Sequence, residues 1–279
     1  MKTIYRLLNP WSSLLGEIHD CYIRVREAAG RQDIHALLTE VGQHLYAQVH
    51  PWLGPASEIE IVLDETCIEY PLDALYYQGK PLFLHKPVTY SLHPHSDTVL
   101  TVSERWKGLL ISHRTSDPER AVPAVRTRFP GSIYYDDLDV RPDDLKNIPK
   151  ADFVLISGHG GPKSGIDLEH IRIRPETLVQ MAPRLVYLDS CRLGLHRGFL
   201  EDLHRSGTRY YLAPILNNES GESSTKTIER FFGALHDGES PSSALYLARK
   251  SLYEHYTSKG DDFDLVMIRA FPFRIYRLN

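Results

Sequence analysis

The chain has 279 residues, 42% of them hydrophobic and 24% charged, which is enough for a full α/β core. Its net charge of −4 at pH 7 argues against a general nucleic-acid-binding protein, because contact with phosphates needs a basic face. The three cysteines, Cys21, Cys67 and Cys191, lie far apart and form no disulfide framework, so the cytoplasm is the expected compartment. The opening residues MKTIYRLLNPW lack the apolar core of a signal peptide, and no stretch approaches the ~20 apolar residues of a membrane span.

The first part of the chain is expected to be helical. Residues 12 to about 50 are predicted to form two helices, because apolar residues recur at helical spacing from Leu14 to Val25 and again from Ile34 to Val49, with Gly30 and Asp33 between the two runs. We expect a helical N-terminal region, residues 1–55, packed on the sheet of a main domain, residues 56–279. A surface for oligomer or partner contacts is the alternative for this region.

Short strands and helices then alternate. IEIVLD from Ile59 is an expected strand, YPLDAL a turn into a short helix, and KPLFLHKPVTYSL two further strands. KGLLISH from Lys107 and SIYY from Ser132 are expected strands as well, with helices over 117–128 and 142–148. Such alternation is typical of βαβ units and predicts a mostly parallel sheet with helices on both faces.

The second half continues the pattern. DFVLISGHGG from Asp152 and LVYLDSCRLG from Leu185 are predicted strands that end in polar residues, with a short edge strand (171–173) and a helix (176–181) between them. A helix over 198–205, a strand from Arg209 and helices over 223–235 and 242–256 follow. A closing strand from Ile268 contains Pro272, which places it at an edge of the sheet.

The two polar strand ends carry the candidate chemistry. In a parallel sheet the two tips lie side by side, which brings His159 near Cys191 as base and nucleophile. Gly194 permits a sharp turn after the cysteine, and a helix beginning nearby would favour the thiolate. The glycines around His159 suit a backbone N–H directed at a substrate carbonyl oxygen. Considered alone, a histidine like His159 is more often structural than catalytic, and a cysteine like Cys191 is more often part of the core than a nucleophile.

Asp189 is the third unusual residue, a carboxylate at the end of a buried strand. Alternation along a strand would place it on the same side as Cys191. In a pocket beside the nucleophile it would select a cation, arginine above all. The alternative is an aspartate that caps the next helix.

Two other motifs predict no ligand. GHGGPKSG has glycines and a lysine but lacks the G-x-x-x-x-G-K-[ST] pattern of a phosphate loop. His93 and His95 have no cysteine or carboxylate at ligand spacing, so a loop is expected there. We therefore expect neither a metal nor an organic cofactor.

SGHGG at 157–161, followed by DSCRLG at 189–194, resembles the caspase-like cysteine peptidases and, among them, the CHAT-domain family of bacteria. CHAT elements in the same order are similar to three further stretches, residues 59–92, FLEDLHRSGTRYYLAPILN and SSALYLARKSL, so the resemblance covers roughly residues 55–257. The D-S-C-x-x-G form looks more like metacaspases, whose matching aspartate helps bind a basic P1 residue. The Q-A-C-R-G pattern of caspases is absent.

The resemblance implies that His159 is the general base, Cys191 the nucleophile, and the N–H groups of Gly160 and Cys191 the oxyanion donors, with Asp189 in S1. It further implies a cytoplasmic endopeptidase that cleaves a specific protein partner after Arg or Lys, in bacterial defence or regulated proteolysis. An activating partner or sensor protein is expected; nucleic acid and membrane are not. The alternatives are a catalytically silent caspase-like interaction module and a Cys-His hydrolase acting on small acyl substrates.

Overall fold

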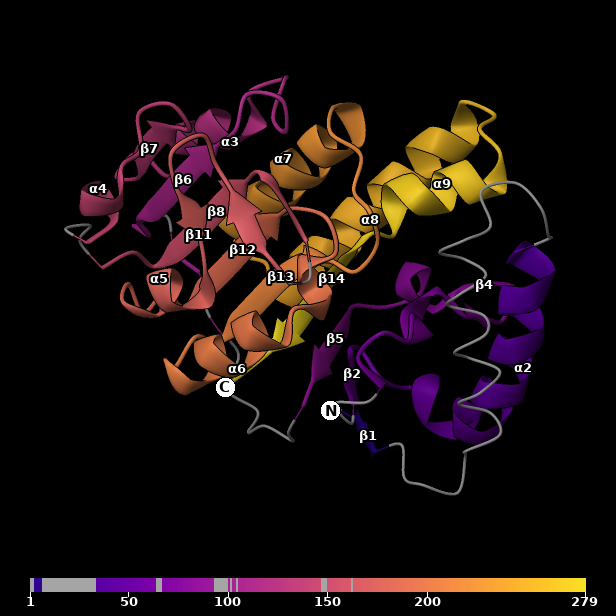
Figure 1. Ribbon diagram of the computed structural model, residues 1–279. Coiled ribbons are helices and arrows are strands. Elements are labelled where there is room, and N and C mark those ends of the chain that lie inside the picture. The colour runs from indigo at the N-terminus through magenta and orange to yellow at the C-terminus, as the bar shows by residue number, and fades with distance from the viewer. Residues whose placement is uncertain are drawn as a thin grey trace.

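Within the described residues, a nine-stranded sheet runs through the middle of the molecule (Figure 1). The computed structural model describes residues 3–6, 34–63, 67–92, 100, 102–103, 105–146, 150–161 and 163–279. The strand order is β1-β2-β5-β14-β13-β12-β8-β6-β7. The strands span Thr3–Arg6 (β1), Ile59–Val62 (β2), Val88–Ser91 (β5), Gly108–Ser112 (β6), Ile133–Asp136 (β7), Phe153–Ser157 (β8), Leu185–Asp189 (β12), Tyr210–Pro214 (β13) and Phe273–Arg277 (β14).

The sheet is mostly parallel, as predicted. Within the described part of the chain, β13 with β14 is the antiparallel pair of this sheet, and its other neighbours are parallel. The carboxyl ends of β6, β7, β8 and β12 therefore meet at one edge, where ligand sites of parallel sheets form.

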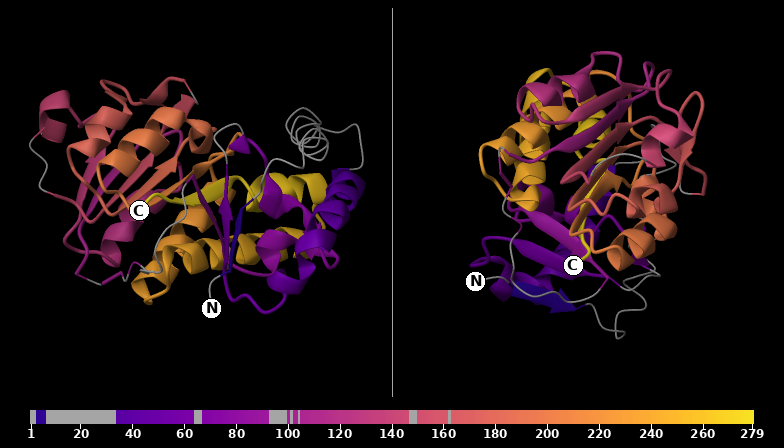
Figure 2. Two further views of the ribbon diagram at one scale, coloured as in Figure 1. Left: turned by 90° about the horizontal axis from the view of Figure 1, so that it is seen from below. Right: turned by 90° about the vertical axis from the view of Figure 1, so that its left-hand side faces the viewer.

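Helices cover both faces, so the fold class predicted from the sequence is confirmed (right-hand view of Figure 2). The strand residues alternate between the two layers: in β8, Val154 and Ile156 pack with α5 and α6, whereas Phe153 and Leu155 pack with α3, α7 and α8. The helices span Ile34–Leu53 (α2), Ala121–Ala124 (α3), Pro142–Lys146 (α4), Pro175–Val179 (α5), Arg197–Arg205 (α6), Glu222–His236 (α7), Pro241–Ser258 (α8) and Phe263–Ala270 (α9).

Two small sheets flank the large one. β9 (His159–Gly161), β10 (Gly165–Asp167) and β11 (Arg172–Ile173) form an antiparallel sheet directly after β8. β3 (Tyr76–Tyr77) and β4 (Lys80–Pro81) form a hairpin between the short 3₁₀ turns η3 (Leu72–Ala74) and η4 (Leu82–Leu84). A Cβ on Gly42 of α2 would clash with the Tyr76 carbonyl, so the glycine lets this helix approach the hairpin closely.

The N-terminal region contains a strand that the sequence analysis did not predict. β1 pairs in parallel with β2 and extends the large sheet. The first of the two expected helices falls on residues 7–33, outside the described residues, and the second is α2. The division into residues 1–55 and 56–279 stays a prediction.

The last strand was predicted wrongly as an edge strand. β14 lies between β5 and β13, and it begins at Phe273, so Pro272 precedes it and removes no hydrogen bond from the ladder. The Pro272 carbonyl accepts a hydrogen bond from Ile215 N at 2.8 Å. Residues from Phe263 to Ala270 form α9 instead of the start of the strand.

A buried ion pair ties the 59–92 segment to the C-terminal part of the chain. Arg249 of α8 donates to Asp73 at 2.6 Å and also to the Phe271 and Phe273 carbonyls. Tyr90 donates to the second oxygen of Asp73 at 2.6 Å. The aspartate of the YPLDAL element therefore holds the last helices and β14 in place.

Candidate active site

The structure places His159 and Cys191 at equivalent positions beyond two adjacent parallel strands. Ser157 at the end of β8 is in register with Asp189 at the end of β12, and each candidate catalytic residue lies two positions further along. Gly158 N donates to Asp189 O at 3.1 Å, which joins the two tips.

The neighbours of the two residues are in close contact. A Cβ on Gly160 would lie 2.6 Å from the Ser190 hydroxyl oxygen and would clash with the Gly165 carbonyl. Glycine at 160 therefore allows the turn at Ser190 and Cys191 to pack against the strand that carries His159. This packing is the strongest observation that the two motifs form one site.

Cys191 is half-buried, and its Sγ donates to the Asn218 carbonyl at 3.6 Å. The sharp turn occurs at Arg192, which has φ of 58°. Gly194 has another role than the one predicted: a Cβ there would lie 2.8 Å from Ala213 O, so it permits close packing on β13. The predicted helix-dipole effect on the thiol is also not supported, because α6 begins only at Arg197, after a 3₁₀ turn.

His159 is exposed and is held by a side chain that the sequence analysis missed. Its Nε2 lies 2.7 Å from Thr115 Oγ1, in the loop after β6. The same hydroxyl lies 3.0 Å from His113 Nδ1, and the two imidazole rings meet edge to face at 4.8 Å between centroids. The His113 Nε2 faces Asp137 Oδ2 at 3.4 Å.

One contact has a defined donor, and we assign the protons of this hydrogen-bond network from it. The backbone N–H of Thr115 can only donate, and it points at His113 Nδ1 at 3.3 Å. His113 therefore carries its proton on Nε2, toward Asp137, and the Thr115 hydroxyl donates to His113 Nδ1. That hydroxyl in turn accepts from His159 Nε2–H, which leaves His159 Nδ1 free to accept a proton.

Asp189 is 3% exposed and accepts hydrogen bonds from three neutral side chains. The donors are Ser157 Oγ at 2.8 Å, Ser224 Oγ at 2.6 Å and Asn218 Nδ2 at 2.5 Å. Burial raises the pKa of Asp189 to about 6, partly offset by these bonds, and the charge of Asp117 adds to the rise. Asp189 does not cap the helix that follows it, because the N-cap of α6 is His196.

Asp117 is a second buried carboxylate that the sequence analysis placed only in a helix. It accepts from Ala121 N at 2.7 Å and Val122 N at 3.0 Å at the start of α3. Burial raises its pKa as well. The charge of Asp117 disfavours that of Asp189, and buried carboxylates in such an arrangement create a local preference for a cation.

The signal for these additional residues was their place after strands. His113 and Thr115 follow β6 and Asp137 follows β7, at the same edge as the two candidate catalytic residues. Among the described residues, His113, Asp137 and Glu169 also bring donor atoms within 4.8 Å of one another, so that together they could hold a metal ion. His93 and His95 lie outside the described residues.

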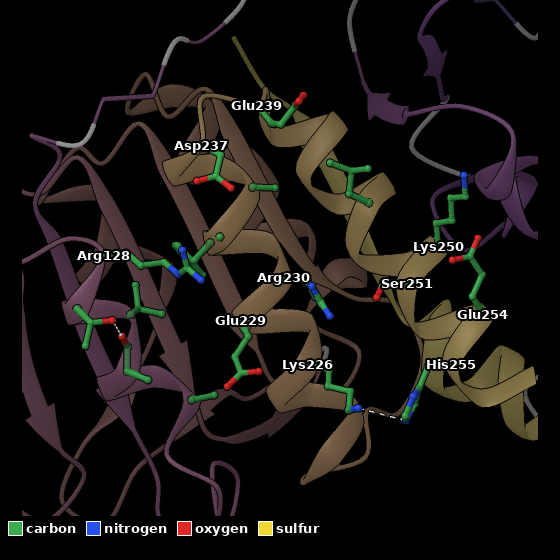
Figure 3. Close-up of a pocket in the computed structure, with 18 residues that line it drawn as sticks. Arg128, Lys226, Glu229, Arg230, Asp237, Glu239, Lys250, Ser251, Glu254 and His255 are labelled. Carbon is green, nitrogen blue, oxygen red and sulfur yellow. Dashed lines mark hydrogen bonds between the residues drawn. The ribbon is translucent and has the colours of Figure 1, made fainter. Parts of the chain in front are cut away.

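A hollow of about 930 Å³ lies elsewhere, over α3, α7 and α8 (Figure 3). Side chains of both charges line it, Lys226 and Glu229 among them, and none of His159, Cys191 and Asp189 does so. No helix of the described chain is long and apolar enough to span a membrane.

Comparisons with known proteins give no match to a protein-family model and none to a curated protein sequence. Solved structures do match. The complex of the pro- and mature domains of RgpB, a Porphyromonas gingivalis gingipain, has a TM-score of 0.61 at 10% identity, covering 99% of this chain and 78% of that one. The fold is caspase-like.

A second match is the Saccharomyces cerevisiae separase–securin complex. Its TM-score is 0.52 at 14% identity, covering 79% of this chain and 16% of the other. At such identities the caspase-like likeness concerns the fold, and the roles of individual residues rest on the geometry of this chain.

Proposed function

We propose that the protein is a cysteine endopeptidase with a His159–Cys191 dyad that cleaves a protein partner after arginine or lysine. The observation that carries this proposal is the packing of Ser190 against Gly160, together with the register of β8 and β12. A caspase-like fold with a histidine and a cysteine at these two strand ends is suited to acyl transfer through a thiolate.

In this mechanism His159 Nδ1 takes the thiol proton, because Thr115 holds the opposite ring nitrogen. The Cys191 thiolate attacks the scissile carbonyl, and His159 returns the proton to the leaving amine. Water then releases the acyl group from the enzyme. The N–H groups of Gly160 and Cys191 would stabilise the oxyanion, and each such donor typically contributes about 10²- to 10³-fold in rate.

The basic preference rests on Asp189 and Asp117. The Asn218 amide donates to Asp189, where a substrate guanidinium or ammonium would bind. A cation that displaces this amide gains a buried carboxylate partner, with arginine favoured because its planar fork can engage both oxygens. Asn218 must therefore move when a basic P1 side chain binds.

The cellular context is proposed from the CHAT-like and metacaspase-like motifs alone. We place the protein in the cytoplasm, in bacterial defence or regulated proteolysis, with an activating partner or sensor protein that docks on residues 1–55.

The test is a library of fluorogenic peptides varied at P1, assayed with the wild type, Cys191→Ala and His159→Ala. We expect cleavage after Arg and Lys, its loss in both variants, and unchanged thermal unfolding of Cys191→Ala. Full cleavage by either variant would place the nucleophile or the base elsewhere. A preference for leucine or aspartate would refute the basic pocket and leave the dyad standing.

The alternative is a catalytically silent interaction module. It is favoured by the contacts of Asn218, whose backbone carbonyl accepts from the Cys191 thiol and whose side-chain amide donates to Asp189. One residue therefore occupies both the candidate nucleophile and the candidate S1 carboxylate. An arginyl acyloxymethyl ketone separates the two functions, because it requires both the S1 pocket and a reactive thiol. Labelling of Cys191, read by mass spectrometry, supports the peptidase, and an unlabelled thiol supports the module.

A further inference from the structure

His113, Asp137 and Glu169 converge from three separate segments beside the candidate active site. They lie in the loops after β6 and β7 and in the turn after β10, and their donor atoms are all within 4.8 Å of one another. Asp137 is 3% exposed, and its Oδ1 accepts no hydrogen bond. A buried carboxylate oxygen without a donor is costly unless a cation or another ligand compensates it.

The two nearby arginines donate to the neighbouring carboxylate instead. Asp136 itself is engaged by Arg114 and Arg120, at 3.3 and 3.1 Å, so these arginines do not reach the free Asp137 oxygen.

The donor set identifies the type of metal. One imidazole nitrogen with two carboxylate oxygens suits Zn²⁺ better than Ca²⁺ or Mg²⁺, which prefer oxygen ligands alone. Tetrahedral zinc with ligand distances of roughly 2.0–2.1 Å places its ligands about 3.3–3.4 Å apart. His113 Nε2 and Asp137 Oδ2 are 3.4 Å apart. Glu169 is exposed on a turn, so it can move inward to become the third ligand.

We propose that His113, Asp137 and Glu169 bind Zn²⁺, with water as the fourth ligand, and that the bound ion switches the active site off. The second part rests on the proposed peptidase function. Zinc would displace the proton from His113 Nε2, so that Nδ1 carries one and donates to the Thr115 hydroxyl. That hydroxyl then donates to His159 Nε2, and the proton of His159 lies on Nδ1.

The hydrogen-bonded series of His113, Thr115 and His159 contains three protons before and after zinc binds. Each proton moves to the other side of the group that carries it. The Thr115 backbone N–H loses its acceptor, one hydrogen bond of 3.3 Å. His159 Nδ1 can no longer accept the thiol proton of Cys191. Zinc would therefore inhibit without touching the thiol.

Binding is measured first, by titrating Zn²⁺ into metal-free full-length Cys191→Ala with a competing chromogenic chelator. The catalytic thiol is then absent and cannot be the ligand. We expect one Zn²⁺ per chain, and at least tenfold weaker binding when Asp137→Asn or Glu169→Gln is added. Asp167→Asn is the matched control, an acidic residue two positions from Glu169 that pairs with Arg172 instead.

Co²⁺ replaces Zn²⁺ in a second measurement, and the intense visible bands of a tetrahedral site should appear in Cys191→Ala and be lost in Glu169→Gln. Equal zinc affinity in all variants, or no stoichiometric binding, would overturn the site.

Peptide cleavage by the dyad-intact protein tests the switch. We expect zinc to inhibit cleavage with the same midpoint concentration as zinc binding. In Glu169→Gln this midpoint should rise at least tenfold, while cleavage without metal is unchanged. Stoichiometric zinc binding without inhibition would refute the switch and leave the site. An absence of cleavage in metal-free protein would refute the peptidase proposal, while the binding results decide the site independently.

Discussion

Asp189→Asn should make the folded protein more stable at neutral pH while it removes cleavage after basic residues. Burial raises the pKa of Asp189 from 3.8 to about 6, so the folded state binds this proton more tightly than the unfolded state. Stability from this group is therefore fully present below about pH 4 and is lost as the pH rises through about 6. The difference corresponds to about 3 kcal/mol above pH 7.

Urea unfolding of both proteins at pH 4 and at pH 8 measures this effect. The asparagine keeps the shape and part of the hydrogen bonding, so any packing change contributes equally at both values. The gain at pH 8 relative to pH 4 isolates the charge, and we expect up to about 3 kcal/mol. Asp167→Asn, whose carboxylate is half-exposed, should show no such difference. A variant that is destabilised equally at both pH values would refute the argument.

Activity should change in the opposite direction. Removing one partner of a buried ion pair typically costs ~3–5 kcal/mol, so kcat/KM for arginine at P1 should fall by a few hundred-fold or more. The wild type should also lose about tenfold in this constant between pH 7 and pH 5 as Asp189 is protonated. The pH dependence of kcat/KM that remains in Asp189→Asn reports the dyad alone. An identical pH profile in the two proteins would contradict the role of Asp189 in binding the basic P1 residue.

Three further predictions concern the groups around the site and the fold. Thr115→Val should lower kcat about tenfold with little change in KM, because His159 loses its orienting hydrogen bond; Thr115→Ser should restore it, and a variant that changes KM alone would contradict this role. Cys191→Ala should unfold at the wild-type temperature in calorimetry, since a half-buried thiol contributes little to the core, and a large loss would point to a structural cysteine. Asp73→Ala should cost about 3–5 kcal/mol in urea unfolding because it leaves Arg249 buried without its counter-ion, whereas a loss below 1 kcal/mol would show that the backbone carbonyls suffice.

The sheet and the position of the two candidate catalytic residues followed from local patterns in the sequence. Buried strands such as LVYLD are continuous apolar runs, and parallel topology fixes which of their ends meet. β14 could not be placed in the same way. A proline inside a strand indicates an edge strand, whereas a proline one residue before a strand does not, and the local sequence does not distinguish the two cases. β1 has four residues and pairs only through long-range contact with β2, which no local period reveals.

The partners of the site were harder to predict than its two central residues. Asn218 and Ser224 reach Asp189 from the loop after β13 and the first turn of α7, and neither position carries a motif. Thr115 acts through a single hydroxyl whose distance to His159 depends on the loop after β6. Such roles arise from tertiary packing, so composition and spacing could not separate these residues from ordinary loop residues.

The energetic contrast between two buried aspartates supports a functional role for the strand ends. Asp73 is paired with Arg249 and Tyr90, as a buried charge must be if it serves the fold. Asp189 has three neutral donors and another carboxylate nearby, so its pKa rises and its charge reduces stability at neutral pH. A neutral asparagine would serve the fold better at that position. A cation that arrives from outside the chain would compensate the carboxylate, and in the proposed function this cation is the basic side chain of the substrate.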